Sequence, residues 1–558
     1  MSFAISLLLL AQAAAVTPQT PPETPPEKKA TVEGRVVKAG TGEPLKKARL
    51  TLFGAEPSTS SAAGSGYGAT SDANGRYVIR DVEPGRYRLT AERNGYVRLA
   101  YGQRGFGPNR QGATLTLSEG QRMKDVDFRL IQGGAIVGKI VDEENEPLGR
   151  VSVQAVRFAY LQGGRRMLPM GSSSTNDLGE YRLFGLSPGR YLVRATPIGV
   201  PDYVPAPQEL AGLAEEGYVP LFYQSTADAA RATQIEVGSG TEVRGIDFIL
   251  TQSKVVRVRG HVVDPQSSGP IRQAMVMLMR RGSSSFMFDM RGSVPVQANR
   301  GNTFELRGVA PGEYVIIAQV MRDRQLFVAR QDLDVGSSNV ENVVLTISPG
   351  VEIRGTARLE GTAKVDLSAV RIGLQPREMN PMASSGMAQV KEDGAFTFQS
   401  VGKDYFRVAV FAAPPDVYLK SARMGEDDVL ENGLDMTRRE VAGVLDLVFS
   451  QEGGKAEGVV LNDKNDPVSG ATVVLVPDSR KRSQEHLFKS ASTDQNGRFT
   501  LQSIPPGEYK LFAWEDVDQG AWFDPEFLKP HEEKGETCEV DAHQATTKQL
   551  RVIPSIAR

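Results

Sequence analysis

Pro188-Gly189-Arg190-Tyr191, followed by the alternating run Leu192-Val193-Arg194-Ala195, is the stretch of this sequence that decides its fold. A Pro-Gly pair favours a tight turn, and alternating residues after it are typical of a strand with one buried face. The pattern recurs, once in a degenerate form, at Pro84-Gly85-Arg86-Tyr87, Pro311-Gly312-Glu313-Tyr314, Gly402-Lys403-Asp404-Tyr405 and Pro506-Gly507-Glu508-Tyr509. Roughly 90 to 120 residues separate the copies, which predicts five domain-sized β modules.

The segments before each Pro-Gly turn also repeat in a fixed order. An alternating, β-branched strand opens each module around a central glycine, namely Gly34, Gly138, Gly260, Gly355 and Gly458. Three modules then carry a tight turn of the kind in which Asx side chains bond the backbone, such as Thr493-Asp494-Gln495-Asn496-Gly497. About seven short strands in about 100 residues predict an all-β, Ig-like or transthyretin-like antiparallel β-sandwich.

The ordered set of a central-Gly strand, a Thr-Asp-x-x-Gly turn and Pro-Gly-x-Tyr resembles the carboxypeptidase regulatory-like domain, repeated in tandem. This resemblance implies a transthyretin-like sandwich related to carbohydrate-binding-like folds. In some proteins of that family the domain accompanies a metallocarboxypeptidase catalytic domain, and nothing in this sequence resembles that catalytic part. Module 4 is the most divergent copy, because Lys391-Glu392-Asp393-Gly394 replaces the Asx turn and no proline precedes Gly402.

The repeats divide the chain into seven expected segments. They are a signal peptide (1–15), a Pro-rich linker (16–30) and five sandwiches at 31–132, 133–252, 253–349, 350–451 and 452–558. The apolar run Leu7-Leu8-Leu9-Leu10 followed by Ala13-Ala14-Ala15 favours export, although no basic residue precedes it. We therefore expect an exported protein of the periplasm, the cell surface or the extracellular space, without an integral membrane segment in the mature chain.

Composition narrows the classes of function. The formal net charge is −2, with both signs interspersed, which argues against nucleic acid as a partner. The four histidines lack metal-ligand spacing, and no nucleophile elbow or phosphate-binding loop is present. The single cysteine, Cys538, lies in an alternating stretch that predicts a buried position. We expect no catalytic residue, no cofactor and no metal, and hence not an enzyme.

Aromatic residues in expected loops are the candidates for ligand contact. They are Trp514, Trp522, Tyr101, Tyr218 and Tyr223. Such rings more often pin loops to a core, and we favour that reading; the functional alternative is a platform for glycan or peptide. The run Tyr101-Gly102-Gln103-Arg104-Gly105-Phe106-Gly107 is interpreted as a solvated loop.

Three hypotheses remain. The first is a non-enzymatic, exported scaffold or adhesion protein of the bacterial envelope, in which five modules form a rod that binds envelope proteins. The second is a carbohydrate-binding envelope protein that uses the loop aromatics to hold polysaccharide. The third is a hydrolase-associated regulatory protein with a catalytic centre on loops such as Phe158 to Ser174 or Pro201 to Tyr223, which lack histidine.

Overall fold

Each module is built from short strands that bury every second side chain. In the strand that follows the first Asx turn, Tyr77 and Ile79 are buried while Val78 is 38% exposed. Such alternation covers one face of each sheet with apolar residues, which two sheets bury by packing face to face. The computed structural model describes residues 29–55, 66–107, 110, 112–161, 164–197, 215–267, 269–281, 290–322, 325–361, 365–376, 386–437 and 443–555.

The strands and short helices are assigned to modules 1 to 5 as follows. Module 1 contains β1 (Ala30–Lys38), β2 (Arg49–Gly54), β3 (Tyr67–Thr70), β4 (Arg76–Val82), β5 (Gly85–Glu92), β6 (Leu99–Ala100), β7 (Leu115–Leu117), β8 (Arg122–Met123) and β9 (Phe128–Leu130). Module 2 contains β10 (Gly134–Val141), β11 (Val151–Leu161), β12 (Gly164–Ser174), β13 (Glu180–Leu186), β14 (Gly189–Pro197), β15 (Glu215–Tyr218), β16 (Leu221–Phe222), β17 (Ile235–Val237), β18 (Glu242–Val243) and β19 (Phe248–Ile249). Module 3 contains β20 (Gln252–Val263), β21 (Met275–Arg280), β22 (Met290–Pro295), η2 (Ala298–Arg300), β23 (Thr303–Val309), β24 (Gly312–Arg322), β25 (Gln325–Val335), β26 (Val340–Thr346) and β27 (Ser348–Pro349).

The two remaining modules carry most of the described helices. Module 4 contains β28 (Val351–Glu360), η3 (Leu367–Ala369), β29 (Arg371–Pro376), β30 (Met387–Gln389), β31 (Ala395–Val401), β32 (Tyr405–Ala412), β33 (Tyr418–Met424), β34 (Asp427–Asp428), α2 (Val429–Asn432), β35 (Leu434–Asp435) and β36 (Leu445–Ser450). Module 5 contains β37 (Gly454–Leu461), β38 (Thr472–Pro477), η4 (Ser479–Lys481), η5 (Glu485–Leu487), β39 (Lys489–Ser492), β40 (Arg498–Ile504), β41 (Gly507–Trp514), η6 (Ala521–Phe523), α3 (Pro525–Leu528), η7 (Lys529–Lys534), β42 (Glu536–Val540) and β43 (Ala545–Arg551). The predicted tandem array of β-sandwiches is confirmed.

The opening strand has the same two neighbours in every module. It pairs antiparallel with the strand that precedes the Pro-Gly turn, as β1 does with β4, and parallel with the closing strand, as β37 does with β43. One sheet of each sandwich is therefore mixed, whereas the sequence predicted antiparallel pairing throughout. The difference arises because the chain crosses from one sheet to the other before it returns beside its own first strand.

The central glycine of the opening strand is required by this parallel pairing. A Cβ atom at Gly138 would lie 1.9 Å from the backbone oxygen of Ile246, and one at Gly34 would lie 2.1 Å from that of Val126. The ring of Tyr77 comes from the neighbouring strand β4, and its hydroxyl donates to the same Val126 oxygen at 2.6 Å. The closing strand can approach so closely only where no side chain intervenes.

The tyrosine of the Pro-Gly motif closes its own turn. The hydroxyl of Tyr314 donates to the carbonyl of Ala310 at 2.8 Å, and that of Tyr509 donates to Pro505 at the same distance. Tyr191 makes the equivalent bond to Ser187 and is fully buried. This four-residue return resembles the tyrosine corner of other sandwiches. In the degenerate copy, Tyr405 instead donates to the carbonyl of Asn432 in α2.

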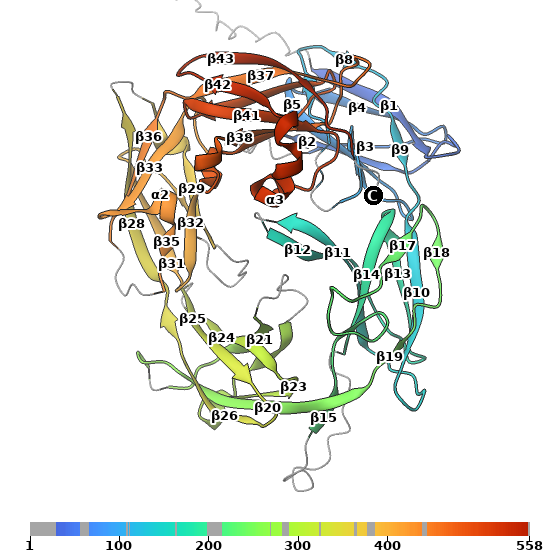
Figure 1. Cartoon of the computed structure of the whole chain (residues 1–558), viewed down its shortest axis with the longest axis vertical. Helices are drawn as coiled ribbons and strands as arrows, with labels where there is room; N and C mark the ends of the chain where they lie inside the picture. The colour runs from blue at the N-terminus through green and yellow to red at the C-terminus, as the bar shows by residue number, and fades with distance from the viewer. Residues whose placement is uncertain are drawn as a thin grey trace, which may run out of the picture.

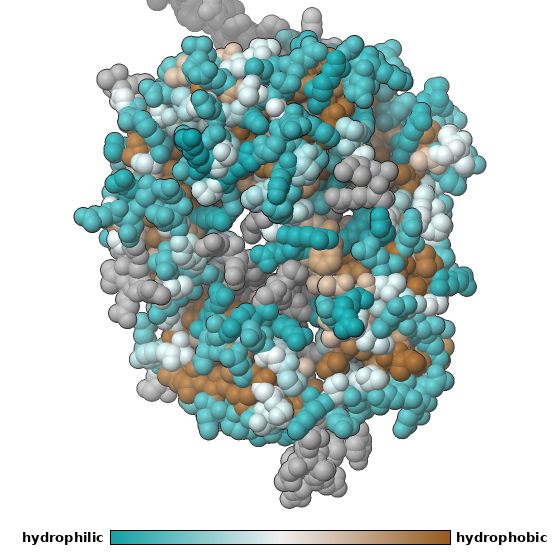
Figure 2. All heavy atoms as spheres, in the orientation of Figure 1, coloured by the Kyte–Doolittle hydropathy of each residue, from teal (hydrophilic) through white to brown (hydrophobic). Residues whose placement is uncertain are grey.

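The five modules close into a ring, so that module 5 lies beside module 1 (Figure 1). Strand β15 of module 2 pairs with β20 of module 3, and Arg330 of module 3 pairs with Asp404 of module 4 at 3.2 Å. An isolated parallel bridge joins Thr114 of module 1 to Asp494 of module 5. The expected rod is therefore wrong. Hydrophilic residues prevail on the face shown in Figure 2.

Three expectations from the sequence concern the N-terminal segments, the domain boundaries and the segment from Phe158 to Ser174. The predicted signal peptide and most of the Pro-rich linker lie outside the described residues. The domain boundaries within the array stay a prediction. The segment from Phe158 to Ser174, expected as a loop, instead lies in the hairpin of β11 and β12, which points toward the centre of the ring (Figure 1).

Candidate functional site

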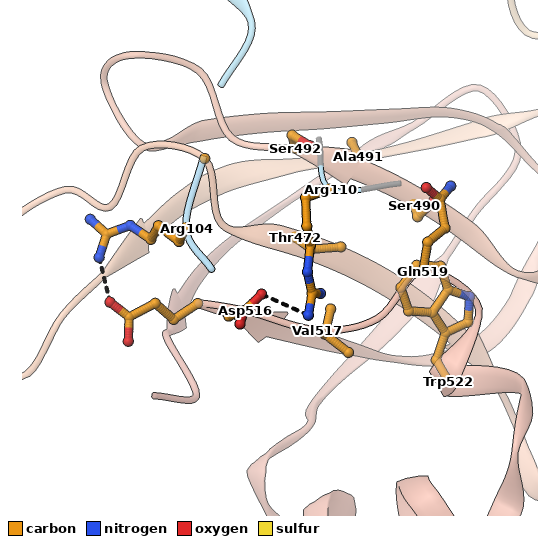
Figure 3. Close-up of a pocket in the computed structure, with 12 residues that line it drawn as sticks. Arg104, Arg110, Thr472, Ser490, Ala491, Ser492, Asp516, Val517, Gln519 and Trp522 are labelled. Carbon is orange, nitrogen blue, oxygen red and sulfur yellow. Dashed lines mark hydrogen bonds and ion pairs between the residues drawn. The ribbon is translucent and has the colours of Figure 1, made fainter. Parts of the chain in front are cut away.

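The ring is closed by a set of charged side chains that we call the latch: Arg104 and Arg110 of module 1, and Glu515, Asp516 and Asp518 of module 5. Arg110 Nη2 lies 3.0 Å from Asp516 Oδ1 (Figure 3). The same nitrogen lies 2.9 Å from Asp518 Oδ1, and Arg104 pairs with Glu515. The side chains of Arg110 and Asp518 are only 10% and 9% exposed. Water screens such buried charges weakly, so the ion pairs of the latch act more strongly than pairs on the open surface.

Backbone contacts accompany the latch. The amide of Thr116 donates to Gln495 Oε1 at 3.2 Å, and Gln495 Nε2 donates back to the carbonyl of Thr116 at 3.4 Å. A Cβ atom at Gly470 would lie 2.0 Å from the carbonyl oxygen of Gly102. The run from Tyr101 to Gly107 is therefore part of an interface, and its interpretation as a solvated loop is wrong. The sequence contains the two arginines and the three acids of the latch, but nothing in it indicates that residues about 400 positions apart lie next to each other.

The hairpin of β11 and β12 ties module 2 to both partners of the latch. Arg157 donates to the carbonyl of Phe106 in module 1 and, at 2.8 Å, to that of Pro188 in its own module. Tyr160 donates to Asp524 Oδ2 in module 5 at 3.0 Å, and its ring lies 5.8 Å from that of Phe527. Three modules thus meet around one point.

A cavity of about 620 Å³ lies at this meeting point, and we call it the lumen cavity. Aromatic rings and arginines dominate its wall, together with two acids of the latch. These residues are Phe106, Phe158, Tyr160, Tyr191, Trp514, Phe527, Arg110, Arg157, Arg165, Arg190, Asp516 and Asp518. Rings and guanidinium groups also stack on each other, with Arg157 4.4 Å above Tyr191 and Arg165 4.6 Å above Phe158. Such a wall suits a ligand with both flat and polar faces.

Several polar atoms of the same wall are buried and lack a hydrogen-bond partner among the described residues. They are Trp514 Nε1, His531 Nδ1, and Nε and Nη1 of Arg110. Burial lowers the pKa of His531, and the charge of Lys534 adds to this effect, so the imidazole is neutral at pH 7. Buried polar groups are normally paired, which makes these atoms candidates for ligand contact.

The structure separates the predicted site residues into two groups. Trp514 and Trp522 are 2% and 4% exposed, and Trp514 stacks on Phe512 at 5.2 Å. Trp514 lines the lumen cavity, whereas Trp522 lines the smaller pocket next to the latch (Figure 3). Neither indole offers an open face on which a sugar could stack.

The predicted tyrosines lie elsewhere. Tyr101 and Tyr223 are half-buried at equivalent places in modules 1 and 2, and their rings lie 6.0 Å from Phe128 and 5.9 Å from Phe248. Tyr218 is the last residue of β15, at the junction with module 3. None of the three lines the lumen cavity. Sequence reasoning missed the arginines, whose meeting depends on the closure of the ring.

The described ranges contain neither a candidate metal site nor a helix that could span a membrane. Within them, no group of three His, Cys, Asp or Glu side chains could hold a metal ion. No helix found there is long and apolar enough to cross a membrane. Cys538 is 1% exposed, as predicted, and burial raises the pKa of its thiol.

Comparison with known proteins finds a family match in modules 1 and 5. The family model of the carboxypeptidase regulatory-like domain matches residues 31–131 and 456–517. No curated protein matches the chain. Among solved structures, it resembles the minor pilin GBS52 of Streptococcus agalactiae, with 12% identity, coverage of 40% of this chain and 96% of that chain, and a TM-score of 0.22.

Two further solved structures resemble the array. For BcpA, the major pilin subunit of Bacillus cereus, the identity is 9%, the coverage 57% of this chain and 99% of that chain, and the TM-score 0.14. For two B repeat units of the collagen binding protein of Staphylococcus aureus, the identity is 10%, the coverage 76% of this chain and 100% of that chain, and the TM-score 0.12. These likenesses concern the fold and carry no conclusion about function.

Proposed function

We propose that this chain, which carries carboxypeptidase regulatory-like domains in modules 1 and 5, is a non-enzymatic, exported binding and structural protein of the bacterial envelope. The observation that carries the proposal is the convergence of modules 1, 2 and 5 on the lumen cavity. There, aromatic rings, arginines and buried polar atoms without described partners surround one space. Such a wall is suited to recognition, and it exists only while the ring is closed.

Binding to isolated envelope tests this proposal. The purified chain is sedimented with envelope fragments of the bacterium that makes it, and the bound fraction is measured. We compare it with Arg104→Glu/Arg110→Glu, which places like charges in the latch, and with Arg129→Glu on the exposed side of β9 as the matched control. The wild type and the control should bind, and the latch variant at least tenfold more weakly. No binding by the wild type, or equal binding by all three, would contradict the proposal.

A second candidate function, polysaccharide binding, is favoured by the aromatic and arginine lining of the lumen cavity. Titration with a panel of polysaccharides and peptidoglycan tests it, with Trp514 fluorescence as the reporter because this ring is part of the wall. A saturable change that is lost in Arg165→Gln and kept in Arg166→Gln would support it. The same signal in both variants, or no response to any glycan, would leave only the protein-binding form of the proposal.

A further inference from the structure

A second cavity, of about 730 Å³, lies between modules 4 and 5. Module 4 contributes Tyr405, Arg407, Phe411 and Tyr418 to its wall, and module 5 contributes His486, Lys489 and Phe523. Arg407 and Glu485 form an ion pair across the junction, and Lys455 pairs with Asp416 nearby at 3.4 Å. The cavity is therefore held between two modules that are linked on more than one side.

Lys489 is the unusual residue of this wall. It is the first residue of β39, which among the described strands lies at the edge of its sheet and pairs with β38, where Lys489 lies opposite Leu475. Burial lowers the pKa of Lys489, whose side chain is half-buried in the wall of the cavity. Within the described part of the chain, Lys489 forms no ion pair. Of the acids in the wall, Glu485 is engaged with Arg407, and Glu431 is exposed.

His486 completes the polar part of the wall. Burial, and next the charge of Lys489, lowers the pKa of His486 to about 4, although Asp428 opposes the shift. The imidazole is therefore neutral near pH 7 and can donate one hydrogen bond. His486 and Lys489 lie three positions apart in the sequence, and both line the same cavity.

The rest of the wall combines polar side chains with apolar rings. The rings of Phe488 and Phe523 lie 4.9 Å apart, and Phe411, 43% exposed, lies on the module 4 side. Lys489 is half-buried and has no anion beside it among the described residues, so an anion that enters the cavity gains an ion pair that water screens less than one on the open surface. An anion that also carries an apolar group would replace water along these rings.

We propose that the cavity between modules 4 and 5 binds a small carboxylate joined to an apolar group, with Lys489 as the residue that pairs with the carboxylate. His486 donates the second hydrogen bond, and the apolar group packs against Phe411, Tyr418 and Phe523. This site is separate from the lumen cavity, and it does not depend on the function proposed above.

Isothermal titration with benzoate and with benzamide as its neutral analogue tests the proposal on the full chain. Lys489→Met keeps the length of the side chain and removes the charge, and Lys481→Met, in exposed η4, is the matched control. We expect benzoate to bind the wild type and Lys481→Met at least tenfold more tightly than it binds Lys489→Met. Benzamide should bind all three weakly.

Thermal unfolding with and without benzoate provides a second measurement if the affinity is too low for titration. Benzoate should raise the Tm of the wild type and leave that of Lys489→Met unchanged. Lys489→Met alone should melt no lower than the wild type, because Lys489 is half-buried and forms no ion pair among the described residues, and Met keeps the length of the side chain. Equal affinity of benzoate and benzamide for the wild type, undiminished benzoate binding by Lys489→Met, or no benzoate binding at all would overturn the proposal.

Discussion

A Cβ atom added to Gly260 would lie 2.0 Å from the backbone oxygen of Val343, whereas one added to exposed Gly336 in the same module meets nothing within 4 Å. Because the obstacle is backbone of the paired closing strand, it cannot rotate away. We expect Gly260→Ala to destabilise module 3 by roughly 3 kcal/mol and Gly336→Ala by less than about 0.5 kcal/mol. Urea unfolding measures both, and similar midpoints for the two variants would refute the pairing described.

The tyrosine of the Pro-Gly motif gives a graded prediction. Tyr191 is fully buried and bonded to Ser187, while Tyr87 is half-buried and bonds to Glu83 at 2.9 Å. Tyr191→Ala should cost roughly 3 kcal/mol or more, and Tyr87→Ala clearly less, because less ring area returns to water. Calorimetric unfolding of the two variants checks this order, and the reverse order would contradict it.

His486 predicts a dependence of stability on pH. Its folded pKa of about 4 lies below its ordinary value of 6.5, so protonation favours the unfolded chain. The stabilisation is complete above about pH 6.5 and is lost as the pH falls toward 4, by roughly 1–3 kcal/mol for this half-buried group. The difference in unfolding free energy between the wild type and His486→Gln should shrink over that window. A difference that stays constant would show that the imidazole is not desolvated.

At the scale of elements, alternation and turn residues were enough to predict strands, the repeat and the sandwich. They could not predict the mixed sheet, because parallel pairing of β1 with β9 depends on a crossover and not on local pattern. They also missed the hairpin of β11 and β12, whose end is fixed by Asp524 and Phe527 more than 350 residues away. Burial of Trp514 and Trp522 likewise follows from packing that a single sequence does not display.

Tyr160 tests the anchoring of that hairpin. Tyr160→Phe removes the hydrogen bond to Asp524 and keeps the ring contact with Phe527, which should cost about 1 kcal/mol. Amide hydrogen exchange in β12 should become faster, while exchange in β10 of the same module stays unchanged. Unaltered exchange in β12 would show that the hairpin is held without Asp524.

At the scale of the whole molecule, the account depends on closure of the ring by one chain. The latch joins residues about 400 positions apart, so the sequence supported a linear array as well as a ring. Replacing Arg104 and Arg110 by glutamate places negative charges next to Asp516 and Asp518. At this largely buried site the repulsion costs on the order of several kcal/mol. We therefore expect Arg104→Glu/Arg110→Glu to open the ring while each module stays folded.

Small-angle X-ray scattering of the full chain and of Arg104→Glu/Arg110→Glu measures this closure most directly. A closed ring of this length should have a radius of gyration of roughly 25–30 Å, and five modules in line roughly twice that value. We predict the compact value for the wild type and a clear increase for the variant, with unchanged β-sheet circular dichroism in both. An extended wild-type chain, or a variant as compact as the wild type, would contradict the closed ring held by the latch.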